Sequence, residues 1–208
     1  MKSFIYDTVM RPLTSDWYRE VLERVPEGAH LLDIGIGTGG ALARNAELLR
    51  EKQLKITGVD IDAHYVKRAQ KRFSRNDLSD LVQVRLESIY DHHGGPYDAV
   101  YFASSFMLLP EPERALRHAI SLLKPGGRIY FTQTFEEKHA PLMEKVKPLL
   151  GRLTTMEFGR VTYEEDFLNV IRSAGLDVDE FSVMNRIGDR SFRIAVAMPS
   201  VGEPSDAA

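Results

Sequence analysis

The chain has 208 residues, 43% of them hydrophobic and 27% charged, which is a composition typical of a globular protein with one sizeable core. The formal net charge of -3 gives no broad attraction to nucleic acid or to an anionic membrane, and the absence of cysteine excludes disulfides, thiolate metal ligands and cysteine nucleophiles. No apolar run reaches the roughly 18 residues of a membrane span, and the N-terminus lacks the apolar core of a signal peptide. We therefore expect a cytoplasmic protein with no nucleic-acid partner and no stable membrane span.

Strand-like and helix-like segments alternate along most of the chain. Short apolar runs predict strands at 30–34, 55–60, 81–86, 97–103 and 128–134. Apolar residues at helical spacing predict helices at 41–52, 63–75, 111–123 and 162–175. This alternation is typical of an α/β protein, in which helices cover both faces of a parallel sheet.

The end of the chain departs from this alternation. Two strand-like runs, 176–185 and 190–198, are separated only by the short turn "RIGD". They should form a hairpin, so the last strand should be antiparallel to the strands beside it. We expect residues 1–198 to form a single domain and the small, polar residues of 199–208 to form a flexible tail.

The segment "DIGIGTGG" (33–40) places four glycines between the first predicted strand and the first predicted helix. Glycines let a ligand approach the backbone, and a helix N-terminus offers unpaired N–H groups. Gly35, Gly37 and Gly40 match the dinucleotide pattern G-x-G-x-x-G, so an NAD(P)-binding oxidoreductase is one interpretation. Asp33 favours another, because a carboxylate beside this loop would repel a pyrophosphate and attract an ammonium group such as that of S-adenosylmethionine.

Five segments, in order, resemble the motifs of the class I S-adenosylmethionine-dependent methyltransferases. They are "LLDIGIGTG", "GVDID", "RLESIYD", "PYDAVYFASSFMLL" and "LLKPGGRIYFTQ", and together they cover roughly residues 28 to 134. The resemblance implies a Rossmann-like seven-stranded α/β sheet of strand order 3-2-1-4-5-7-6, with strand seven antiparallel and helices on both faces. It also implies that the cofactor is S-adenosyl-L-methionine and the product S-adenosyl-L-homocysteine.

The resemblance assigns parts of the cofactor to particular residues. Asp33 would hold the ammonium group, and Asp60 would accept both ribose hydroxyls, since a carboxylate accepts two donors side by side. Capping of the helix at 63–75 is the alternative role for Asp60, and Asp62 could also supply it. The glycines expected under the methionine part are Gly35, Gly37 and Gly39. The contacts expected around adenine and the sulfonium group are Ile61, Glu87, Ser88, Ile89, Ala103 and Ser104.

The motif "DHHGG" (91–95) is a candidate metal site because it contains two adjacent histidines. Adjacent side chains rarely converge on one ion, and no other candidate ligand lies near them in the sequence. We therefore expect no metal and interpret these residues as a loop near the adenine.

The acceptor would be recognised outside these motifs. Residues 1–27 resemble the leading lid segment and helix of small-molecule, lipid and quinone methyltransferases, although plain packing of an N-terminal helix is the alternative. Residues 135–162 form a second lid candidate, an insertion over the substrate. If the acceptor must lose a proton, the candidate catalytic bases are Tyr6, Glu136 and His139, with His92 as a further one.

The sequence thus predicts methyl transfer to a small-molecule or lipid-like acceptor. Methylation of a protein or peptide side chain is an alternative, as is a non-catalytic cofactor-binding subunit of a larger enzyme. The acceptor atom and the oligomeric state stay open.

Overall fold

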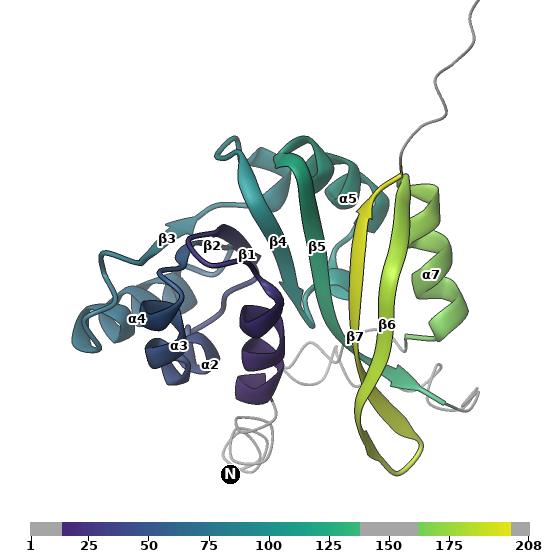
Figure 1. The fold of residues 1–208 in the computed structure, drawn as a ribbon, viewed down its shortest axis with the longest axis horizontal. Helices are drawn as coiled ribbons and strands as arrows, with labels where there is room; N and C mark the ends of the chain where they lie inside the picture. The colour runs from purple at the N-terminus through teal and green to yellow at the C-terminus, as the bar shows by residue number, and fades with distance from the viewer. Residues whose placement is uncertain (1–13, 138–161, 201–208) are drawn as a thin grey trace, which may run out of the picture.

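The computed structural model describes residues 14–137 and 162–200, which form one seven-stranded sheet of order β3-β2-β1-β4-β5-β7-β6 (Figure 1). β1 to β5 pair in parallel, whereas β7 runs antiparallel to both of its neighbours. This confirms the predicted topology. The strands are β1 (His30–Ile34), β2 (Lys55–Asp60), β3 (Val82–Leu86), β4 (Tyr97–Ala103), β5 (Leu123–Glu136), β6 (Leu176–Ile187) and β7 (Arg190–Pro199).

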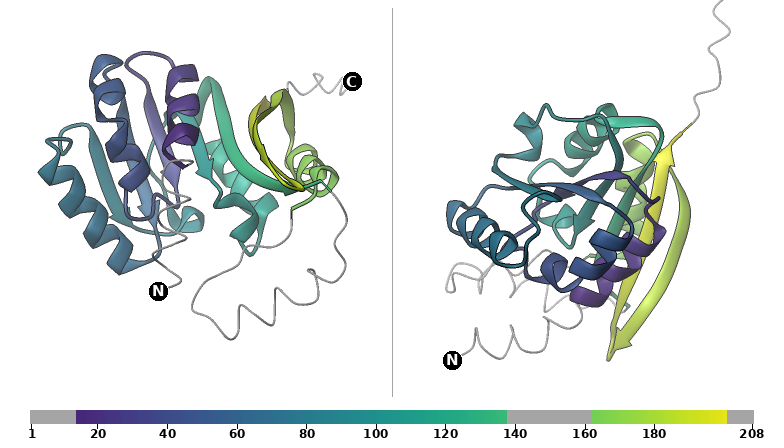
Figure 2. Two further views of the ribbon diagram at one scale, coloured as in Figure 1. Left: turned by 90° about the horizontal axis from the view of Figure 1, so that it is seen from below. Right: turned by 60° about the vertical axis from the view of Figure 1, so that its left-hand side comes forward.

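Helices cover both faces of the sheet, as the two views of Figure 2 show. One face is covered by the helix at 14–24 together with α2 (Gly40–Arg44), α3 (Ala46–Glu51) and α4 (Ala63–Arg75), whose apolar side chains share one buried cluster. The other face is covered by α5 (Pro112–Ser121) and α7 (Glu164–Ser173), which bury a second cluster rich in phenylalanine. None of the helices within 14–137 and 162–200 is long and apolar enough to cross a membrane.

Several predicted boundaries match the structure residue for residue: 30–34, 55–60 and 97–103 as strands, and 63–75 as a helix. β5 is longer than predicted at both ends. Phe135 and Glu136, which we expected to begin the insertion, are strand residues paired with Ser191 and Arg190 of β7. The reason is that the β6–β7 hairpin extends past the parallel strands and gives β5 a longer partner.

Two helix predictions are wrong in detail. The segment 41–52 is not one helix: it breaks at Asn45, whose Nδ2 donates to the carbonyls of Ala41 and Ser15, each at 3.0 Å. An asparagine that binds nearby carbonyls competes with the helical backbone. In the second case, the helix predicted at 162–175 spans only Glu164–Ser173; Tyr163 occupies its N-cap position without a side-chain cap, and the Thr162 hydroxyl accepts from Gln133 Nε2 at 3.3 Å.

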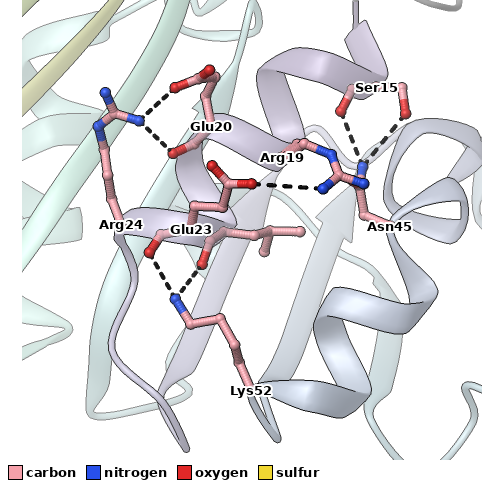
Figure 3. A network of polar contacts seen from close by, with 8 residues as sticks. Ser15, Arg19, Glu20, Glu23, Arg24, Asn45 and Lys52 are labelled. Carbon is pink, nitrogen blue, oxygen red and sulfur yellow. Dashed lines mark hydrogen bonds and ion pairs between the residues drawn. The ribbon is translucent and has the colours of Figure 1, made fainter.

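The helix at 14–24 is attached to the rest of the domain at both ends (Figure 3). Asn45 binds its first turn through Ser15. At the other end, Lys52 Nζ donates to the carbonyls of Leu22 and Glu23 at 2.7 and 2.8 Å, which satisfies acceptors that a helix C-terminus leaves open. Arg24 adds an ion pair to Glu180 of β6. These attachments hold the helix against the end of β1, where the candidate site begins.

Candidate functional site

The glycine loop after β1 is built from three left-handed glycines, which are required for two different reasons. A Cβ on Gly35 would lie 2.8 Å from Cβ of Ser105, and one on Gly39 would lie 2.3 Å from the Phe73 ring of α4. Both positions therefore serve packing. A Cβ on Gly37 would meet no atom closer than 4.0 Å outside its chain neighbours. Its φ of +59° lies in the left-handed region, so the backbone conformation there still favours glycine. Gly37 is thus the glycine of this loop that borders open space, where a ligand could contact bare backbone.

Asp60, at the end of β2, lies against this loop. Its Oδ2 accepts from the backbone N–H of Gly37 at 2.8 Å, and its Oδ1 accepts from the N–H of Asp62 at 2.9 Å. Each carboxylate oxygen can accept a second donor, so two neighbouring hydroxyls remain a chemically suitable ligand. Asp62 caps α4 by accepting from the N–H groups of His64 and Tyr65, which confirms the capping role that we expected for it.

Apolar side chains are exposed beside Asp60. Ile61, expected against the adenine, is 79% exposed, and Leu86 at the end of β3 is 58% exposed. Asp60 and Leu86 are paired across β2 and β3, so the two apolar groups follow neighbouring strand ends. Apolar groups exposed beside a ribose-type carboxylate suit the face of a flat base.

The segment after β3 only partly follows the expectation. Glu87 donates its backbone N–H to the carbonyl of Asp60 at 3.0 Å, which places it next to the proposed ribose site. Ser88 caps a short 3-10 turn, η1 (Ile89–Asp91), through Tyr90 N. The Ile89 side chain is buried in the α5/α7 core, so the contact expected between Ile89 and the adenine would come from its backbone.

The end of β4 carries a strained serine. Ser104 has φ of +56°, in the left-handed region that non-glycine residues rarely adopt, and its N–H donates to the carbonyl of Thr132 at 2.8 Å. Such strain costs about 1–3 kcal/mol and persists where the surroundings enforce it, often at functional sites. The next residue, Ser105, donates to the carbonyl of Ile34 at 2.6 Å and fastens the end of β4 to the glycine loop. Ala103 and Ser104 therefore lie at the strand end beside the loop.

Asp33 is the most unusual group of the site. It is fully buried, and its Oδ2 accepts from the Tyr18 hydroxyl at 2.8 Å, whereas its Oδ1 has no hydrogen-bond partner. Burial raises the pKa of Asp33 from its usual 3.8 to about 7, the Tyr18 hydrogen bond opposes this rise, and Asp60 adds to it. An unpartnered buried carboxylate oxygen fits an ammonium group, so these residues fit the amino-acid end of S-adenosylmethionine.

Tyr18 was missed by the sequence analysis, which considered Tyr6 instead. The available signal was weak: Tyr18, Val21 and Leu22 share the buried face of the N-terminal helix. That periodicity identifies a buried face but does not say which hydroxyl meets Asp33.

The four candidate bases differ in whether the structure describes them and in whether they already have partners. Tyr6 and His139 lie outside the described residues. Glu136 is ion-paired with Arg190 at 2.8 Å, across the β5–β7 pairing, so its carboxylate already has a cationic partner. His92 is fully buried and both of its ring nitrogens are hydrogen-bonded, which excludes contact with an acceptor. Among the described side chains, no group of three or more His, Asp or Glu residues could hold a metal ion.

Comparisons with known proteins give relatives for the span of the chain that carries this site. A family model described as a methyltransferase domain matches residues 32–129, the span that contains the glycine loop and Asp60. A ubiquinone biosynthesis O-methyltransferase of Chromobacterium violaceum is 29% identical over 163 residues, which are 76% of this chain and 68% of the relative. The chain spans between 42% and 68% of the length of the first curated relatives that it matches.

Solved structures show the same fold at low identity. The cyclase SpnF has a TM-score of 0.72 at 20% identity, over 92% of this chain and 82% of that one. A geranyl diphosphate methyltransferase in complex with S-adenosylmethionine has a TM-score of 0.70 at 14% identity, over 88% of this chain and 84% of that one. The family model over residues 32–129, the curated relatives and the shared fold together support a class I S-adenosylmethionine-dependent methyltransferase. Because one similar fold belongs to a protein named as a cyclase, the fold alone does not define the reaction.

Proposed function

We propose that the chain transfers the methyl group of S-adenosylmethionine to a hydroxyl oxygen of a small phenolic or quinone-related acceptor. The observation that carries the cofactor assignment is the buried Asp33 carboxylate, which has one oxygen without a partner beside a glycine loop open at Gly37. The acceptor class is supported by the relative named as an O-methyltransferase of ubiquinone biosynthesis. Because that relative is only 29% identical, its acceptor is proposed for this chain and not assigned to it.

Most of the chemistry in this proposal is positioning. S-adenosylmethionine supplies a methyl group on a positively charged sulfur, which is a good leaving group. The residues of the chain therefore have to hold the ligand and exclude other orientations, and such alignment is worth up to about 7–11 kcal/mol. Asp33 would bind the ammonium group, Asp60 the ribose hydroxyls, and Ile61 and Glu87 the adenine. Gly37, Ala103 and Ser104 would line the space between these contacts.

A hydroxyl acceptor must also lose its proton, so this proposal requires a base. We propose His139, because histidine ordinarily titrates near neutral pH, with Tyr6 as the alternative. Parallel substitutions His139→Gln and Tyr6→Phe distinguish them: the variant without the base should lose turnover while its affinity for S-adenosylhomocysteine is unchanged.

We further propose that residues 1–27 and 135–162 select the acceptor, because the strand ends of β1 to β4 are assigned to the cofactor. Three contacts between described residues support the second segment as a discrete insertion. The N–H of Glu136 donates to the carbonyl of Thr162 at 3.1 Å, and Arg193 pairs with both Glu137 and Glu164, at 2.9 and 2.6 Å. The two ends of the insertion are therefore held together independently of what lies between them.

This arrangement makes the insertion replaceable. Exchange of residues 138–156 for a short glycine-serine linker should leave S-adenosylhomocysteine affinity within about tenfold, ~1.4 kcal/mol, while most methyl transfer is lost. Unchanged turnover on the true acceptor would refute the assignment of this segment. Loss of cofactor binding by a folded variant would assign it to the cofactor site instead.

The whole proposal is tested with the purified chain, labelled S-adenosylmethionine and a panel of phenols, quinols, amines and peptides, with products identified by mass. Methylation of a phenol or quinol hydroxyl supports the proposal. Methylation of peptides alone would favour the side-chain alternative. Tight binding of NAD(H) without S-adenosylhomocysteine binding would favour the oxidoreductase, and tight S-adenosylhomocysteine binding without transfer to any acceptor would favour a cofactor-binding subunit.

A further inference from the structure

The carboxylate of Glu87 is held by a buried histidine. Glu87 has a side chain that is 26% exposed, and its Oε2 lies 2.8 Å from Nδ1 of His92, which is completely buried. A carboxylate only accepts, so Nδ1 of His92 carries the proton. In the neutral ring Nε2 is then an acceptor, and the Tyr97 hydroxyl, 2.8 Å away, donates to it.

The surrounding loop is built around this histidine. Nε2 of His118, on α5, donates to the His92 carbonyl at 2.7 Å and fixes the backbone. A Cβ on Gly94 would lie 2.6 Å from both Nε2 of His92 and the Tyr97 hydroxyl, so the chain passes directly over their hydrogen bond. The motif "DHHGG" is explained by this packing, because its first histidine and first glycine form a closed structural unit.

Glu87 is thus joined to three chain segments through its backbone and through His92. The backbone of Glu87 is bonded to Asp60, its Oε2 is bonded to His92, and His92 is bonded to Tyr97 on β4. Oε2 accepts from the buried His92 and the Glu87 side chain is 26% exposed, so Oε1 is the oxygen that we assign to a donor from outside the protein. The neighbouring Asp60 and exposed Ile61 place that outside space in the proposed adenosine site.

We infer that His92 is a positioning residue, which holds Glu87 so that its free oxygen accepts from the adenine amino group and the site selects adenine over a 6-oxopurine. This inference depends on the proposed cofactor site. An amino group donates to the carboxylate, whereas a 6-oxo group presents an acceptor to an acceptor. A site built to bind a donor rejects analogues that lack it, because its own polar group is left unpaired.

The test compares affinities for two probes, S-adenosylhomocysteine and S-inosylhomocysteine, by calorimetry. The wild-type chain should prefer the adenine compound by at least about tenfold. His92→Asn keeps an N–H near the position of Nδ1 and should retain most of this preference. His92→Gln places its amide near the position of Nε2 and should reduce the preference severalfold. The matched control is His93→Gln, at the adjacent exposed histidine, which should behave as wild type.

A double-mutant comparison separates positioning from general stability. In a Glu87→Ala background, His92→Gln should change the ratio of the two affinities no further, because the carboxylate that it positions is gone. If His92→Gln lowers the melting temperature but keeps the wild-type ratio, the histidine is only structural and the inference is overturned. Binding of both probes with equal affinity by the wild type would overturn this inference alone. Failure of the wild type to bind S-adenosylhomocysteine would overturn the cofactor site, and the inference with it.

Discussion

The Tyr18 hydroxyl donates a 2.8 Å hydrogen bond to Oδ2 of Asp33 and joins the N-terminal helix to the end of β1. Both side chains are buried, and Oδ1 of Asp33 has no partner. Burial raises the pKa of this carboxyl group from its usual 3.8 to about 7, so it titrates far closer to neutral pH than an exposed aspartate. A ligand cation beside it would favour the ionised form, so ligand binding and proton release should be coupled.

Asp33→Asn should remove a pH dependence of stability. The folded-state pKa is raised from 3.8 to about 7, so between these values the folded chain holds a proton that the unfolded chain has lost. The free energy of unfolding should therefore fall as pH rises through this window, by up to ~1.4 kcal/mol per pH unit. Urea unfolding of the ligand-free wild type and variant at pH 5, 6 and 7 gives the free energy of unfolding of each protein. The difference between the two proteins should change with pH by up to this slope. Parallel curves would contradict the raised pKa.

Tyr18→Phe should weaken S-adenosylhomocysteine binding most at low pH. The Tyr18 hydrogen bond opposes the rise in the pKa of Asp33, so its loss should raise that pKa further and reduce the ionised fraction that binds an ammonium group. We expect roughly tenfold weaker binding at pH 6.5, equivalent to ~1.4 kcal/mol, and a smaller loss at pH 8.5, by calorimetry. Tyr101→Phe is the control, because that buried hydroxyl binds Thr132 and not Asp33. An equal loss at both pH values would show that Tyr18 acts only by packing.

Substitutions of Asp60 and Asp62 should have different effects: the first should weaken ligand binding, and the second should lower the stability of the fold. Asp60→Ala removes the expected acceptor of the ribose hydroxyls and should weaken S-adenosylhomocysteine binding by at least ~1–3 kcal/mol. Asp62→Ala removes only the cap of α4 and should cost about 0.5–2 kcal/mol of unfolding free energy, with ligand affinity retained. Both quantities are measured for both variants. Unchanged affinity in Asp60→Ala would show that the ribose contact is placed wrongly.

Gly37 and Gly39 offer a second contrasting pair. Both are left-handed, with φ of +59° and +65°, so alanine at either should cost about 1–2 kcal/mol. Only at Gly39 would the new Cβ collide with Phe73, so Gly39→Ala should be clearly the less stable variant in urea unfolding. Gly37→Ala should keep most of its stability and lose S-adenosylhomocysteine affinity, because its methyl group enters the proposed ligand space. Normal S-adenosylhomocysteine binding by Gly37→Ala would show that Gly37 serves only the tight turn and does not border the ligand.

The sequence alone determined the elements whose signals are local. The bounds of β1, β2, β4 and α4 follow from short apolar runs and from helical spacing, and the hairpin β6–β7 follows from two runs with a short turn between them. The capping role of Asp62 follows likewise from its place one residue before α4. Strand period, helix period and capping depend on residues a few positions apart, so they can be recognised without knowledge of the packing.

The tertiary structure decided which polar groups meet. Tyr18 and Asp33 are brought together by a helix docked through Asn45 and Lys52, and the length of β5 depends on a partner strand far along the chain. The direction of Ile89 into the core and the attachment of Glu87 to His92 depend on how the loop after β3 closes over Tyr97. In each case the sequence shows the residue types, but a hydrogen bond requires its two groups within about 3 Å, and only the packed elements set that distance.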